Sequence, residues 1–194
     1  MSILPKVIIF NSKHVYNASR FIDLENRSKE ADLASGVKVD SNCKQAYDDL
    51  HNKHLHSYLI FRISDDDTTI IIEKKGEKNA PYGEFVKEMK SLVGDGKQCR
   101  YAAVDVQVEV QRQGAEGMSR ISKVIFVQYC PDEAPVRRRM LYASSVRALK
   151  ATLGLESLLQ IQASELSDID EKVIKHEVNL INLKFCKVMS SQRA

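Results

Sequence analysis

The chain of 194 residues contains 43% hydrophobic and 28% charged residues, a composition typical of a soluble globular protein with one domain and a tail. Its formal net charge of +3 is too small to indicate a nucleic-acid or membrane partner by itself. No apolar run approaches the roughly 20 residues that a membrane-spanning helix needs. The four cysteines are far apart and form no Cys-x-x-Cys pair, which argues against a zinc knuckle or a dense disulfide framework and favours a reducing cytosol.

Residues 1–33 differ from the rest of the chain because their apolar and polar side chains follow no clear periodicity. The first part of this segment carries basic residues and no acid, as organelle transit peptides do, but its apolar run Val7–Phe10 is too short for a secretory signal. We therefore interpret residues 1–33 as a disordered or loosely docked extension, with targeting as the alternative. The compact domain is expected over 34–178, followed by a C-terminal extension and polar tail over 179–194.

In chain order, hydrophobic periodicity predicts the pattern α-β-β-α-β-β-α-β-α. The helices are expected near residues 41–50, 81–93, 135–153 and 168–178, and the strands near 58–63, 68–72, 100–113, 121–130 and 158–163. Residues 64–67 form a turn that joins the first two strands as an antiparallel hairpin. This order predicts an α/β fold of the α+β type, in which helices flank a mixed sheet of five strands.

The stretch Pro131–Leu153 is the most informative of these elements. Proline costs no hydrogen bond in a first helical turn, so the helix is expected to begin at Pro135 and to run for about 18 residues without a breaker. One face carries a normal core stripe: Tyr142, Val146, Leu149 and Leu153. The opposite face is small and apolar with arginines at its start: Arg137, Met140, Leu141, Ser144, Arg147, Ala148 and Ala151. Such a face suits a surface on which another macromolecule sits, and a helix buried on both sides is the alternative.

Catalytic and metal-binding patterns find little support in the sequence. The chain has no phosphate-binding glycine loop and no nucleophile elbow, so we do not expect an enzyme or a cofactor. His51, His54 and His56 come nearest to a metal cluster, but no further Cys or His lies at ligand spacing, and a polar helix end is the favoured interpretation. The arginines at 137–139 could contact nucleic-acid phosphates, yet the basic excess stays within one helix and no aromatic platform lies nearby. We therefore expect no bound metal and no nucleic-acid partner.

Four stretches of the chain resemble the ADF/cofilin family. They are Ala34-Ser-Gly-Val, Cys99-Arg-Tyr-Ala, Lys123-Val-Ile-Phe and, most specifically, Ala134-Pro-Val-Arg-Arg-Arg-Met-Leu-Tyr-Ala-Ser-Ser145. The likeness runs from Ala34 through the last helix and is strongest to the muscle-type cofilins of nematodes. It implies helices on both faces of the central sheet. It also implies a non-enzymatic protein of the cytoplasm and actin cytoskeleton, including muscle myofibrils, that severs and depolymerises filaments.

The resemblance implies two actin-binding surfaces. The first would contact actin monomers and filaments through Ser35, Gly36, Val37, Arg137, Arg139, Met140, Ser144 and Ser145. The second would contact filaments alone, through Arg120 and Lys123 on a hairpin and through Glu171, Lys172 and Lys175 on the last helix. Ser35 would be the site at which phosphorylation, by adding negative charge, switches the protein off.

The family resemblance also implies a monomeric protein that prefers ADP-actin and is inhibited by acidic phosphoinositides. One alternative is a module of the same fold that binds filaments or a nucleating complex without severing. Another is a basic-helix module for phosphoinositides or nucleic acid. Three departures from the family pattern stand out. The family's serine normally lies next to the initiator methionine, whereas here a 33-residue extension ending at Leu33 precedes Ala34. In addition, Val146-Arg147 replaces the usual Lys-Asp pair, and residues 179–187 have no recognised counterpart.

Overall fold

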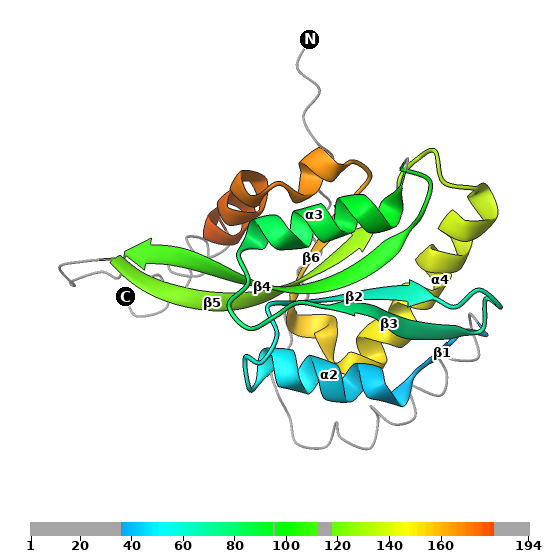
Figure 1. The fold of residues 1–194 in the computed structure, drawn as a ribbon, viewed down its shortest axis with the longest axis horizontal. Helices are drawn as coiled ribbons and strands as arrows, with labels where there is room; N and C mark the ends of the chain where they lie inside the picture. The colour runs from blue at the N-terminus through cyan, green and yellow to red at the C-terminus, as the bar shows by residue number, and fades with distance from the viewer. Residues whose placement is uncertain (1–35, 95, 112–117, 181–194) are drawn as a thin grey trace, which may run out of the picture.

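The computed structural model describes residues 36–94, 96–111 and 118–180, which form a mixed sheet between two layers of helices (Figure 1). The strands are β1 (Lys38–Val39), β2 (Tyr58–Ile63), β3 (Thr69–Lys75), β4 (Arg100–Gln111), β5 (Met118–Tyr129) and β6 (Leu159–Ala163). They lie in the order β1-β3-β2-β4-β5-β6. The outer pairs β1–β3 and β5–β6 are parallel, whereas the inner pairs are antiparallel, so the predicted mixed sheet is confirmed.

The predicted number of five strands is wrong by one in the described part of the chain, because the sheet there has six. The five predicted strands are all present. The additional strand, β1, has only two residues and is too short to show an alternating pattern in the sequence.

The helices are α2 (Ser41–His51), α3 (Tyr82–Val93) and α4 (Val136–Leu153), two 3₁₀ turns, η2 (Leu155–Ser157) and η3 (Leu166–Ile169), and a helix over residues 171–180. Helices α2 and α4 pack with one buried cluster, and α3 and the helix over 171–180 pack with the other. The two clusters lie on opposite faces of the sheet, as the resemblance implied (Figure 1). Within residues 36–94, 96–111 and 118–180, no helix has the length and apolar character needed to cross a membrane.

The position of β2 in the sheet explains why its sequence is a continuous apolar run rather than an alternation of apolar and polar residues. It lies between β3 and β4 at the centre of the sheet, so both of its faces are covered. Leu59 and Phe61 point into the cluster under α2 and α4, whereas Tyr58 and Ile60 point into the cluster under α3.

Helix α4 has the predicted limits because local signals set both ends. It follows Pro135, and it stops at Gly154, whose left-handed backbone (φ 73°) closes the last turn. Tyr142 fixes the helix to the sheet: its hydroxyl accepts a hydrogen bond from the Ile63 amide at 3.0 Å, and its carbonyl accepts one from the Tyr101 hydroxyl. The core stripe predicted for this helix is confirmed, with Tyr142, Leu149 and Leu153 buried and Val146 packed against them.

Candidate functional site

The outward face of α4 begins with an exposed apolar pair. Val136 is 61% exposed and Met140, one turn further along, is 67% exposed. Only four large hydrophobic residues are exposed in the described ranges, and two of them are this pair. An apolar pair of this kind at the start of a helix, beside the exposed Arg137, is the arrangement expected of a contact surface for another protein.

The same face is narrower than the sequence predicted. Ala148 was expected to lie outward, but it is 1% exposed, and Ser145 is completely buried with its hydroxyl donating to the Leu141 carbonyl at 2.6 Å. Ser144 is exposed, as expected. Helical periodicity failed for Ala148 because exposure depends on tertiary packing as well, and η2 contacts α4 at its C-terminal end. Ser145 therefore offers no exposed side chain to a partner in this conformation.

The three arginines of α4 have different surroundings. Arg137 and Arg138 both pair with the carboxylate of Asp67, which lies in the turn between β2 and β3. The guanidinium of Arg138 also lies 5.8 Å from the centre of the Tyr142 ring, and the residue is half-buried. Arg138 therefore stabilises α4 against the rest of the domain. The Arg137 side chain remains 85% exposed, and Arg139 pairs with the exposed Asp132 at 3.2 Å. Arg137 is thus the arginine that a partner of this surface reaches most readily, because the side chains of Arg138 and Arg139 are only 32% and 36% exposed.

The N-terminal part of the predicted first surface lies beside α4. Ser35 falls outside the described residues. Gly36 is exposed and has a left-handed backbone (φ 68°), and β1, which follows it, contacts α4. Val37 is 1% exposed and belongs to the same buried cluster as Tyr142, so its side chain serves the core rather than the surface.

The predicted second surface combines two parts of the chain that are distant in sequence. Arg120 lies opposite Glu109 on the β4–β5 hairpin and pairs with it at 3.1 Å. Lys123 lies opposite Val106, and partial burial lowers the pKa of its ammonium group. Lys172 is exposed, and Glu171 pairs with Lys175 at 2.6 Å on the last helix.

A surface cavity of about 240 Å³ is lined by residues of both the last helix and β4. Glu171 and Lys175 line it together with Val106 and Gln107 of β4, so the last helix stands beside the strand that pairs with Lys123. In Figure 1 the start of α4 lies at one end of the molecule, and the C-terminal end of β4 and the N-terminal end of β5 lie at the opposite end. The two predicted surfaces are therefore separate, and each brings together at least two segments of the chain.

Sequence reasoning missed two residues of the first surface. Val136 carried a usable signal, because it precedes Met140 by one helical turn and belongs to the same outward stripe. Asp67 carried none, since its contact with Arg137 spans 70 residues of sequence.

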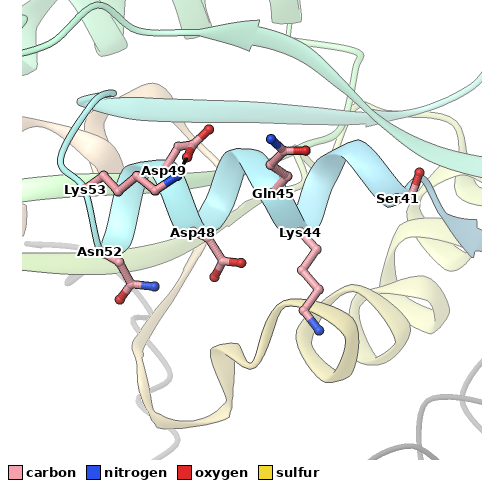
Figure 2. A pocket seen from close by; sticks show the side chains of 7 residues that line it. All are labelled: Ser41, Lys44, Gln45, Asp48, Asp49, Asn52 and Lys53. Atoms are coloured by element: carbon pink, nitrogen blue, oxygen red, sulfur yellow. Dashed lines mark hydrogen bonds and ion pairs between the residues drawn. The ribbon is translucent and has the colours of Figure 1, made fainter.

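A second hollow, on the outer side of α2, does not form a site (Figure 2). Its lining is polar, Asp49 and Lys53 pair with each other at 2.8 Å, and Figure 2 shows Lys44 and Asp48 projecting from the helix without converging. His51 is exposed and contacts Asn52 at 3.2 Å. In the described ranges, no three His, Cys, Asp or Glu residues are grouped so that they could hold a metal ion. This face is a solvated helix surface.

Comparison with known proteins identifies the family. Residues 36–179 match the family described as cofilin/tropomyosin-type actin-binding protein. The chain is 75% identical over 146 residues to actin-depolymerizing factor 2, isoform c, of Caenorhabditis elegans, which covers 75% of this chain and 96% of that protein. It is 34% identical over 155 residues to actin-depolymerizing factor 1, isoforms a/b, of the same organism, covering 72% of each.

The solution structure of the ADF-like UNC-60A protein of Caenorhabditis elegans has the same fold. It superposes with a TM-score of 0.63 at 31% sequence identity, covering 74% of this chain and 94% of that one. The overall fold is thus shared with a protein of related sequence. The chain belongs to the ADF/cofilin family of actin-binding proteins.

Proposed function

We propose that this protein binds actin monomers and filaments, severs and depolymerises filaments, and so promotes actin turnover in the cytoplasm. The observation that carries the proposal is the exposed Val136–Met140 pair flanked by Arg137 and Arg139, in a chain 75% identical to an actin-depolymerizing factor. Apolar side chains that lose water on binding supply affinity, and the arginines around them supply orientation through charge-assisted hydrogen bonds.

Severing follows from the presence of two separate surfaces. The α4 surface would bind one actin subunit, while the surface of Arg120, Lys123, Glu171, Lys172 and Lys175 would contact a neighbouring subunit of the filament. A protein that binds two subunits at once has the highest affinity for the filament geometry in which the subunit spacing matches the spacing of its two surfaces. Its binding therefore shifts the filament toward that geometry. Breakage would then occur where altered and unaltered segments meet. Preference for ADP-actin would have the same origin, as a difference in affinity between two filament states.

Acidic phosphoinositides would compete with actin for the α4 surface. The Arg137 guanidinium is 85% exposed, and Arg147 is exposed further along the same helix, so both can face polyanionic head groups. Phosphorylation of Ser35 would also weaken actin binding, because it would place negative charge beside the same surface. We propose that the protein acts as a monomer.

Cosedimentation with actin filaments tests the proposal. The full chain is expected to pellet with filaments and to raise the unpolymerised fraction, and Arg137→Ala should reduce both effects. Lys44→Ala, on the outer side of α2, is the matched control and should leave both unchanged. Fluorescence microscopy of immobilised filaments separates severing from simple binding, since the non-severing alternative would decorate filaments without breaking them. Pelleting with phosphoinositide vesicles but not with actin would instead support the basic-helix alternative.

A further inference from the structure

Two cysteines that are distant in sequence meet at the end of the β4–β5 ladder. Cys99 directly precedes β4 and Cys130 directly follows β5, one position beyond the paired residues Arg100 and Tyr129. Their sulfur atoms are 3.1 Å apart. Facing positions of antiparallel strands have Cα atoms about 4.5–5.5 Å apart, which is the separation that a disulfide bridges without backbone movement.

The surroundings of the two thiols give them different roles. The hydrogen bond between the two thiols lowers the pKa of Cys130, and the positive charge of Arg139 acts in the same direction, opposed by burial and by Asp132. The same hydrogen bond and burial raise the pKa of Cys99. Cys130 is also the more accessible of the two, being half-buried, whereas Cys99 is 2% exposed. Cys130 is therefore the thiol that becomes a nucleophile, and Cys99 is placed to resolve the product.

We propose that Cys99 and Cys130 are a reversible oxidation site that hydrogen peroxide converts to a disulfide. The Cys130 thiolate attacks one peroxide oxygen, the O–O bond breaks, and the departing hydroxide takes up a proton as water, leaving a sulfenic acid on Cys130. The Cys99 sulfur then attacks the Cys130 sulfur, an S–S bond replaces the S–O bond, and the Cys99 proton leaves with the hydroxyl group as water. Two thiols and one peroxide thus give one disulfide and two waters. A dithiol reductant reverses the reaction by thiol–disulfide exchange.

The other described cysteine does not compete. Burial raises the pKa of Cys43 to about 12, and its thiol contacts the Ile70 carbonyl at 3.6 Å under α2. It is therefore a core residue with little thiolate character at neutral pH. Cys186 lies outside the described residues, and the experiment below treats it by substitution.

The position of Cys130 links this chemistry to the α4 surface, a step that rests on the proposed function. Residues 131–135 connect Cys130 to the start of α4, and Asp132 within them pairs with Arg139. Disulfide formation draws the sulfur atoms from 3.1 Å to about 2.05 Å and removes the thiol of Cys130, whose pKa the positive charge of Arg139 helps to lower. Both changes act on the segment that orients Arg139. The oxidised protein is expected to bind actin filaments several-fold more weakly than the reduced protein.

Peptide mapping tests the disulfide without reference to actin. The full chain is treated with hydrogen peroxide, blocked with iodoacetamide and digested with trypsin. The expected product is the tripeptide 98–100 joined to the peptide 124–137, with a mass two hydrogens below the sum of the two, which disappears after dithiothreitol. Cys186→Ser should leave this product unchanged, and Cys130→Ser should abolish it and protect Cys99 from peroxide. Separate sulfinic acids on Cys99 and Cys130, or linkage of either to Cys43 or Cys186, would overturn the assignment.

Filament cosedimentation of the oxidised and reduced chains tests the consequence. Weaker binding after oxidation, restored by dithiothreitol and absent in Cys130→Ser, is the expected result. Equal binding by fully disulfide-linked and reduced protein would overturn the effect on α4. Failure of the reduced protein to bind actin would instead contradict the proposed function. The disulfide assignment from peptide mapping would not be affected by that result.

Discussion

Asp67 and Arg137 form an ion pair of 3.2 Å between the β2–β3 turn and the first turn of α4. The second carboxylate oxygen of Asp67 pairs with Arg138, so a single acid holds two neighbouring arginines. Asp67 has a left-handed backbone (φ 60°), a conformation that Asp and Asn tolerate better than most other residues. The turn thereby fixes the beginning of the helix that carries the proposed actin-binding surface.

Asp67→Asn should uncouple the turn from α4 while keeping the backbone conformation. We expect the free energy of unfolding to fall by about 0.5–1 kcal/mol, because the pair is only partly shielded from water. The freed arginines should also increase binding to phosphoinositide vesicles at low salt. Urea unfolding and vesicle pelleting measure the two effects. Asp65→Asn is the matched control, since Asp65 lies in the same turn but pairs with Arg62 rather than with α4. Equal effects of the two substitutions would contradict the role given to Asp67.

Met140→Ala and Val136→Ala should weaken actin binding without unfolding the protein. Both side chains are mostly exposed in the free protein, so their removal costs little stability. In the complex they would be desolvated, and each truncation is expected to cost about 1–2 kcal/mol, or roughly five- to thirty-fold in affinity. Cosedimentation titrations measure the loss. Leu55→Ala, an exposed apolar residue outside α4, should bind like the unmodified chain, and a similar loss there would mean that exposed apolar residues act nonspecifically.

Tyr142→Phe tests the attachment of α4 to the sheet. The substitution removes the oxygen that accepts the hydrogen bond of the buried Ile63 amide, so that amide loses this partner. An unsatisfied buried donor costs about 1–3 kcal/mol, which should appear as a lower midpoint in urea. Hydrogen exchange at the Ile63 amide should also become faster than in the unmodified chain. Unchanged stability together with unchanged exchange would show that the hydroxyl does not hold the helix.

Replacing Lys172 and Lys175 together with glutamate should separate filament binding from monomer binding. Lys175 pairs with Glu171 beside β4, so reversal of its charge also introduces repulsion at the cavity that the last helix and β4 line. We expect weaker cosedimentation with filaments and unchanged affinity for monomers, measured by fluorescence titration of labelled actin. Loss of monomer binding to the same degree would contradict the division into two surfaces.

The sequence predicted those features that local signals determine. Pro135 and Gly154 set the limits of α4, and alternation identified β4 over much of its length. What it could not predict depends on contacts between distant segments. Ala148 is buried by tertiary packing that helical periodicity does not contain, and the pairing of Asp67 with α4 joins residues that no local pattern relates. The proposed filament surface likewise depends on the last helix lying beside β4.

Removal of residues 1–33 should strengthen actin binding. Gly36 is exposed and β1 contacts α4, so any chain that precedes Ser35 must leave the domain close to the proposed actin-binding face. We expect a version that begins at Ala34 to bind filaments more tightly and to sever them more often than the full chain, because the extension would occupy space beside the contact surface. Cosedimentation and filament microscopy with equal concentrations of the two proteins measure the difference. A version with residues 1–33 replaced by a Gly/Ser-rich segment of the same length separates crowding from sequence-specific effects, since crowding alone would weaken binding in both long versions. Equal activity of all three would show that the extension does not reach the surface around Arg137 and Met140.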